Sequence, residues 1–189
     1  MHPKSSKQSG MTLVELLVAL AVAMLLISSG IPGFTTLTRN NRLVASANAL
    51  TGLLGEARSE SVSQRRPVSV CGSSSGTACD AAWASGAVAF LDADADGVID
   101  AGDTVLRQVS NPVQSVTVAL TGPTTVRYTS MGWLAANSAG TFRFCDERGS
   151  RYARALLVSA TGRVSTATDT DSPADGIVDD AGGTNLSCP

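Results

Sequence analysis

An apolar run near the N-terminus, interrupted by one carboxylate, constrains this chain more than any other feature. The run covers residues 11–31, and Glu15 is its single charged side chain. A helix needs about 20 apolar residues to cross a bilayer, so we expect a transmembrane helix over residues 11–33. A carboxylate in hydrocarbon is costly and needs a partner. We therefore predict that Glu15 pairs with a positive group on another chain.

A short basic leader, residues 1–10, precedes this run and ends at Gly10. The string Gly10-Met-Thr-Leu-Val-Glu15 resembles the N-terminus of type IV pilins and pseudopilins. The resemblance implies that a prepilin peptidase cuts between Gly10 and Met11 and that the new amino group of Met11 is methylated. It also implies that Glu15 neutralises the N-terminal amine of a neighbouring subunit during assembly. An ordinary secretory signal peptide is the alternative, but its cleavage site would follow the apolar stretch.

The composition argues against catalysis. His2 is the only histidine and leaves with the leader, which removes the commonest general base and metal ligand. No Ser-His-Asp or Cys-His arrangement can then be built, so we expect no enzyme activity and assign no catalytic residue. Loss of Lys4 and Lys7 lowers the formal charge from −2 to −4, which argues against general affinity for nucleic acid.

Beyond the apolar run, hydrophobicity becomes periodic. Apolar residues recur at spacings of three, four and seven over residues 34–66, which predicts an amphipathic continuation of the same helix. We expect residues 67–165 to form a periplasmic β domain, because short Val-, Thr- and Phe-rich runs alternate there with turn residues. The predicted strands are residues 68–71, 86–91, 105–109, 116–120, 125–129, 141–145 and 154–159. We therefore predict an α+β fold with the long helix packed on antiparallel sheets.

All four cysteines follow the apolar run, in the part of the chain expected to face the oxidising periplasm, where disulfides persist. Four cysteines allow three pairings. We favour Cys71 with Cys79, which closes a small Gly- and Ser-rich loop. Cys145 with Cys188 would pin a loose polar tail, residues 166–189, to a central strand. A zinc site is the alternative, but the spacing of Cys71 and Cys79 is too wide for a tight zinc pair.

The order of these parts narrows the resemblance to the minor pilins and pseudopilins of the GspH/FimT type. It rests on individually weak motifs in a distinctive order, residues 83–92, 105–107, 132–133, 142–146 and 157–163. The resemblance implies a type IV pilin-like fold and a minor subunit, at or near the tip of a pilus-like fibre, that helps initiate assembly with other pilin subunits. The alternative machine is a type II secretion system, with the chain as its minor pseudopilin.

One acidic segment matches the spacing of an EF-hand calcium loop, with Gly97 at position six. Its carboxylates belong to Asp92, Asp94, Asp96, Asp100 and Asp103. The flanking runs are typical of strands rather than helices. We therefore favour a hairpin whose Asp and Gly residues satisfy turn geometry, with weak calcium binding as the alternative and no other cofactor. A second acidic string, residues 169–180, is a poorer match that we expect to be solvated.

One basic stretch lies within this acidic domain, and its arginines are Arg143, Arg148, Arg151, Arg154 and Arg163. DNA-binding FimT-like proteins are similar to one another in a Gly-Arg-x-Arg motif near this point. The string here is Gly162-Arg-Val-Ser165, which lacks the second arginine. The resemblance implies DNA as an alternative partner, contacted by the phosphate-binding set Arg148, Arg151, Arg154 and Arg163. The other interpretation pairs these arginines with nearby carboxylates on the solvent face of strands.

Overall fold

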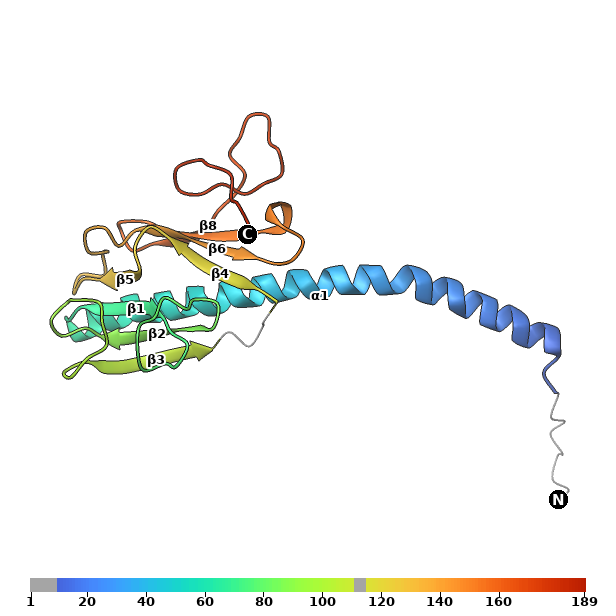
Figure 1. Cartoon of the computed structure of the whole chain (residues 1–189), viewed down its shortest axis with the longest axis horizontal. Helices are drawn as coiled ribbons and strands as arrows, with labels where there is room; N and C mark the ends of the chain where they lie inside the picture. The colour runs from blue at the N-terminus through green and yellow to red at the C-terminus, as the bar shows by residue number, and fades with distance from the viewer. Residues whose placement is uncertain (1–9, 111–114) are drawn as a thin grey trace, which may run out of the picture. The chain divides into compact units, whose positions relative to one another are not determined.

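The computed structural model describes residues 10–110 and 115–189, without the side chains of residues 28–32. Apart from Gly10, the predicted leader lies outside the described residues. The chain divides into two compact units, Met1–Arg39 and Asn40–Pro189. One long helix, α1 (Leu13–Gln64), belongs to both units (Figure 1).

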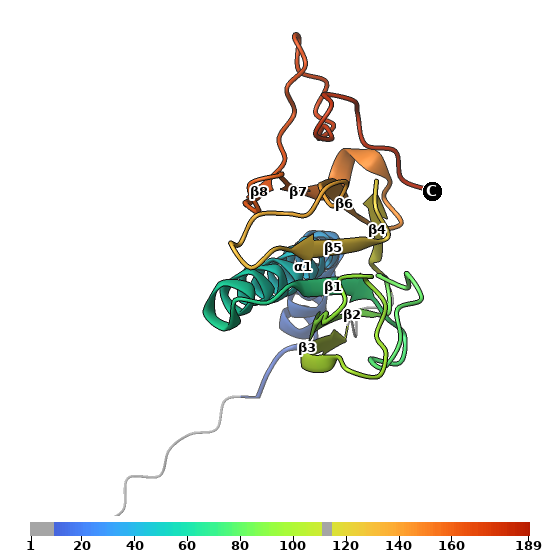
Figure 2. The same cartoon turned by 90° about the vertical axis from the view of Figure 1, so that its left-hand side faces the viewer.

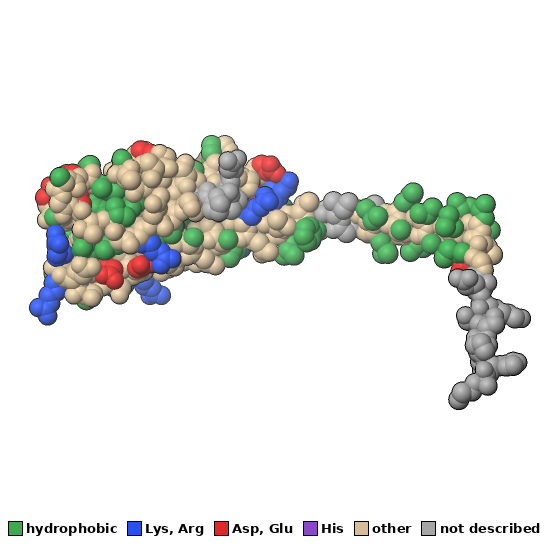
Figure 3. All heavy atoms as spheres, turned by 90° about the horizontal axis from the view of Figure 1, so that it is seen from below, with side chains coloured by type: hydrophobic (Ala, Val, Ile, Leu, Met, Phe, Trp, Pro, Cys, Tyr) green, Lys and Arg blue, Asp and Glu red, His purple; other side chains and the backbone are tan. Residues whose placement is uncertain are grey.

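The first unit contains the start of α1. Thr12 caps the helix, because the backbone N–H of Glu15 donates to Thr12 Oγ1 at 3.3 Å. The large apolar side chains from Met11 to Ile27 are exposed, with exposed fractions from 49% to 74%. Consecutive positions point about 100° apart around a helix, so this apolar surface covers its whole circumference. Figure 3 shows the hydrophobic side chains that face the viewer along this part of α1.

Among the described residues, no helix combines the length and the hydropathy that crossing a membrane requires. The span expected over residues 11–33 is therefore not confirmed and stays a prediction.

The second unit contains two four-stranded antiparallel sheets. Sheet A has the order β3-β2-β1-β5 and sheet B the order β4-β6-β7-β8. The strands of sheet A are β1 (Val68–Gly72), β2 (Gly86–Leu91), β3 (Thr104–Ser110) and β5 (Thr125–Tyr128). Those of sheet B are β4 (Thr117–Thr121), β6 (Gly140–Cys145), β7 (Arg154–Val158) and β8 (Val164–Thr166), with the short helix η1 (Ser150–Tyr152) before β7. The predicted strands are confirmed to within one residue, and β8 is an addition.

The core lies where the second half of α1 meets both sheets (Figure 2). The helix contributes a buried stripe that includes Leu43, Leu50, Leu54 and Ala57, at spacings of seven, four and three. Sheet A packs on it with Val68, Val70 and Val126, and sheet B with Phe142, Phe144 and Leu156. The helix predicted to residue 66 ends at Gln64, and its amphipathic pattern is the one that the packing requires.

Both predicted disulfides are present. Cys71 and Cys79 have their Cα atoms 5.6 Å apart, and Cys145 and Cys188 have theirs 5.9 Å apart. The second bond connects β6 of sheet B to the C-terminal segment. It therefore determines where the chain after β8 lies.

The C-terminal segment is not loose, contrary to expectation. Leu186 is buried against Ala153, Ala155 and Ala167, and its backbone N–H donates to Val178 O at 2.9 Å. The segment lies on the side of sheet B away from α1 in both ribbon views (Figures 1 and 2). The disulfide returns the chain to the sheet, so that an apolar side chain can be buried there.

Tyr128 is a buried residue of this core with an unusual hydroxyl group. Its side chain is fully buried, and its Oη has no hydrogen-bond partner among the described residues. Gly162, at φ +75°, lies against the ring. Burial raises the pKa of Tyr128 to about 12, while the positive charge of Arg58 acts in the opposite direction.

We expect Tyr128→Phe to be neutral or to stabilise the domain by about 1 kcal/mol at pH 7, because it removes a buried hydroxyl without a partner. In the wild type, the unfolded chain loses the Tyr128 proton near pH 10, before the folded chain does, so stability falls as the pH rises from 10 to 12. The variant should lack this loss of stability. The difference in free energy of unfolding between variant and wild type should therefore grow by roughly 1.4 kcal/mol by pH 11. Urea unfolding at pH 7, 9 and 11 measures this effect, and parallel pH profiles would contradict it.

Candidate functional site

The start of α1 presents one exposed carboxylate. Glu15 lies in the first turn of the helix, where backbone N–H groups without helical partners favour a negative charge. Thr12 and Glu15 also have the Thr-x-x-Glu spacing of a capping box, and one of its two hydrogen bonds, from Glu15 N to Thr12 Oγ1, is present. The carboxylate is thus available to another chain, while the residue has a second role in the helix cap. The Thr-x-x-Glu spacing is visible in the sequence. There, however, Glu15 is predicted only as an ion-pair partner, and its place in the helix cap is not predicted.

The first acidic string forms the connection between β2 and β3, which pair as an antiparallel hairpin. The structure brings carboxylate oxygens of Asp92, Asp94 and Asp96 within 4.8 Å of one another. Asp92 is buried, and it accepts hydrogen bonds on both oxygens, from Ser69 and from the backbone N–H groups of Asp96 and Gly97. The predicted hairpin is confirmed, and strands flank it in place of the paired helices of an EF-hand.

Asp100 and Asp103, the other two calcium candidates, also make contacts within this turn. Asp103 accepts hydrogen bonds from Ala93 N at 2.8 Å and from Asp100 N at 3.2 Å. Desolvation and the negative charges of Asp94 and Asp103 raise the pKa of Asp100. A cation would relieve this repulsion, but at Asp92 it would compete with hydrogen bonds that already exist.

Arg148 is a structural residue, which corrects its assignment to the DNA-contacting set. Its Nη2 lies 2.6 Å from Asp146 Oδ2, and the two side chains are 11% and 5% exposed. The same nitrogen donates to Asn40 Oδ1 at 2.9 Å, and the guanidinium lies 4.2 Å from the ring centroid of Tyr152. Arg148 therefore connects the turn after β6 to α1 and is not available to phosphate.

The other three arginines of this set are exposed but divided between two places. Arg151 and Arg154 line a hollow of about 280 Å³ together with Tyr152 and Thr166. Arg163 lies at the far end of β7, where its carbonyl accepts from Ser159 N at 3.0 Å, about 16 Å along the strand from Arg154. The acidic C-terminal segment approaches Arg151, since a Cβ added at Gly176 would lie 3.8 Å from its Nη2.

This division limits any affinity for DNA. Four phosphate contacts would give a slope near −3.6 in a plot of log K against log salt for B-DNA, whereas two would give about −1.8. We expect a slope no steeper than about −2 for the full mature chain in detergent. An Arg151→Ala/Arg154→Ala variant should lose this salt-dependent binding of DNA. Fluorescence anisotropy across a salt series measures the slope. A value near −4 that also depends on Arg163 would contradict this placement.

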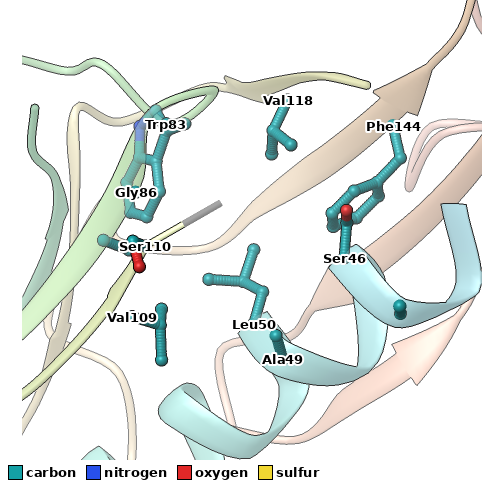
Figure 4. Close-up of a pocket in the computed structure, with 11 residues that line it drawn as sticks. Ser46, Ala49, Leu50, Trp83, Gly86, Val109, Ser110, Val118 and Phe144 are labelled. Atoms are coloured by element: carbon teal, nitrogen blue, oxygen red, sulfur yellow. The ribbon is translucent and has the colours of Figure 1, made fainter. Parts of the chain in front are cut away.

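An apolar cavity of about 240 Å³ lies between α1 and the two sheets (Figure 4). Leu50, Trp83 and Val118 point into it, and the described residues of its lining supply serine hydroxyls but no titratable side chain. Trp83 also packs edge to face on Phe142, with ring centroids 4.8 Å apart. The cavity is smaller than most ligand pockets, and it offers an apolar group burial without the means to orient a charge.

Val62, Met131 and Trp133 are large apolar residues that are 50%, 74% and 60% exposed. Val62 lies against the turn that carries the other two, because a Cβ added at Gly132 would lie 2.9 Å from Val62 Cγ2. We call these three residues the Trp133 patch. The turn that carries it is well held, because Thr129 N donates to Trp133 O at 2.7 Å and Arg58 Nε donates to Gly132 O at 2.9 Å. In the sequence, Gly132 and Trp133 serve only as a family motif, and no exposed patch is predicted there. A tryptophan in a turn is the signal that could have revealed it.

Two crystal structures of the type IV minor pilin FimU from Pseudomonas aeruginosa resemble this chain, each at 27% sequence identity. One has a TM-score of 0.53 and covers 69% of this chain and 91% of the FimU chain. The other has a TM-score of 0.51 and covers 66% and 91%. No curated protein matches the chain. The likeness, together with the long helix on two antiparallel sheets, defines a type IV pilin fold and confirms the predicted α+β class.

The family is defined by two sequence models. Residues 46–162 match the family described as type II transport protein GspH, and residues 5–31 match the prokaryotic N-terminal methylation motif. The chain belongs to the GspH family. It is therefore a minor pilin or pseudopilin of the type IV pilus or type II secretion type, a family of structural proteins.

Proposed function

We propose that this chain is an inner-membrane-anchored minor pilin that enters a type IV pilus-like fibre and helps to initiate its assembly. The main support for this proposal is the surface of α1 up to Ile27, which is apolar all round and has Glu15 as the acidic residue of its first turn. A helix that is apolar all round needs lipid or other helices around it. Lipid would cover it before assembly, and helices of neighbouring subunits afterwards. The match to the methylation motif supports cleavage after Gly10 by a prepilin peptidase and methylation of Met11.

Glu15 would determine the register between subunits. After cleavage, the amine of Met11 and the carboxylate of Glu15 are four residues apart at the same end of the helix, so each subunit offers one cation and one anion. Their attraction across two chains is stronger in a low dielectric than in water. The best-attested use of a buried ionic group is to specify the register between chains. An ion pair between Glu15 and the amine of a neighbouring subunit would specify that register.

Glu15→Gln separates this ionic role from the helix cap, because the amide removes the charge and still provides capping hydrogen bonds. We expect Glu15→Gln and Glu15→Ala to be cleaved normally but to enter fibres about tenfold less, a loss of about 1.4 kcal/mol. Thr12→Ala, which removes only the cap, should stay within about twofold of the wild type. Immunoblots of sheared fibres and of membranes measure incorporation. Normal incorporation of Glu15→Gln with poor incorporation of Thr12→Ala would show a capping role instead.

The Trp133 patch would provide a contact with the globular domain of another pilin subunit. It lies near the C-terminal end of α1, where Val62 is about 33 Å along the helix from Asn40. Tryptophan and methionine are enriched in protein interfaces, and tryptophan often dominates their energy. Because Arg58 holds the turn, the patch is ordered before a partner binds.

We expect Trp133→Ala to reduce incorporation into fibres at least fivefold and to leave folding intact, because the removed ring is mostly exposed. Val98→Ala is the matched control, since Val98 is an exposed apolar residue of the β2–β3 loop. A photo-cross-linking amino acid placed at Met131 should give adducts with other pilin subunits, and the same group at Val98 should not. Equal cross-linking at both positions would contradict the assignment.

The alternative machine is a type II secretion system, in which the chain would be a minor pseudopilin. The match to the type II transport protein GspH family favours secretion, whereas the likeness to FimU favours the pilus. Deletion of the coding region separates them: loss of surface fibres with normal protein secretion supports the pilus, and the reverse result supports secretion.

A further inference from the structure

The second acidic string differs from the first in a way that its sequence does not predict. Carboxylate oxygens of Asp169, Asp171 and Asp179 lie within 4.8 Å of one another. Asp179, which we expected to be solvated, is only 1% exposed. The return of the chain to sheet B places this carboxylate in the interior of the C-terminal segment.

One oxygen of Asp179 has no hydrogen-bond partner in the described part of the chain. Oδ2 accepts hydrogen bonds from the backbone N–H and the hydroxyl of Thr170. Oδ1 is buried and, within residues 10–110 and 115–189, makes no hydrogen bond. A buried carboxylate oxygen without a partner is costly, and buried polar atoms in native proteins are rarely left so. The buried oxygen therefore points to a missing ligand.

The two other aspartates complete a set of three carboxylates with Asp179. The carboxylate of Asp171 is exposed and makes no hydrogen bond with the described residues, while its backbone N–H donates to Asp169 Oδ1 at 3.1 Å. Asp169 Oδ2 accepts from Gly176 N at 2.7 Å, which folds the loop around the cluster. Desolvation and the charges of Asp179, Asp175 and Asp169 raise the pKa of Asp171, as expected for anions held close together.

No side chain of the described part of the chain neutralises this cluster. The guanidinium of Arg151 lies near Gly176, but it makes no ion pair with the three carboxylates within the described residues. Asp175 adds a fourth carboxylate, which accepts from Asn185 Nδ2 at 2.6 Å. The segment therefore brings negative charges together without a matching cation.

We propose that Asp169, Asp171 and Asp179 bind a calcium ion, which holds the C-terminal loop in its folded form. The donors are all oxygens, which suits calcium and disfavours metals that prefer nitrogen or sulfur. Calcium accepts irregular coordination completed by water, whereas magnesium requires near-octahedral geometry. Affinity in the range of about 10⁻⁴ to 10⁻³ M is typical of extracellular calcium modules.

The β2–β3 hairpin provides the comparison within the same molecule. Asp92 is as buried as Asp179, but both of its oxygens have hydrogen-bond partners inside the protein. The hairpin thus provides partners for both oxygens of its buried carboxylate, whereas the described residues provide partners only for Oδ2 of Asp179. Asp94 in the hairpin and Asp171 in the loop are exposed members of the two clusters, and they serve as matched positions.

The test is calorimetric titration of calcium chloride into the full mature chain in detergent. We expect saturable binding, a loss of affinity of at least tenfold for Asp171→Asn, and less than a twofold change for Asp94→Asn. Amide hydrogen exchange gives a second measure: calcium should slow exchange at Gly176 and Ile177 at least tenfold. Asp171 is preferred to Asp179 for the variant, because Asp179 also holds Thr170.

Several results would overturn the proposal. One is the absence of both binding and protection at about 10 mM calcium, which is ten times the highest Kd typical of extracellular calcium modules. Another is equal protection from hydrogen exchange by magnesium at the same concentration. Loss of binding in Asp94→Asn with normal binding in Asp171→Asn would assign the ion to the hairpin and equally overturn it.

Discussion

The burial of one stripe of α1 against two separate sheets is the interaction on which the rest of this domain depends. The sheets share no strand, and both contribute to a core that includes Leu43, Leu50 and Leu54 of the helix. Polar contacts hold the helix at two points. Arg148 reaches Asn40 at one end, and Arg58 reaches Gly132 and Thr161 near the other. One continuous helix, α1, thus contains both Glu15 and the buried stripe that organises the domain.

Much of the fold could be predicted because its signals are local. The change of period after the apolar run indicates the helix, and alternation in runs such as residues 141–145 indicates strands. β8 could not be found this way, because three residues give too little pattern and the strand exists through its pairing with β7. The favoured pairing of the four cysteines, one of three possible, is the one present.

The sites were less predictable, because their properties depend on residues distant in sequence. Arg148 resembles a surface arginine in the sequence, and its burial depends on Asn40, far away in the chain. Asp179 belongs to a polar string, and its burial depends on the disulfide that returns the segment to sheet B. Glu15 is the opposite case, since a span of 21 residues with one charge draws attention to that charge without any tertiary information.

The position of Arg58 has a mechanical consequence. Its guanidinium donates to Gly132 O at 2.9 Å and to Thr161 O at 3.1 Å, so one helical side chain holds two separate loops. A pulling force applied to a partner at Trp133 would load the hydrogen bond to Gly132 O, and part of the force would pass through Arg58 into the helix. In a fibre under tension, Arg58 would thus give the turn at Trp133 a second connection to the domain, besides the backbone of β5.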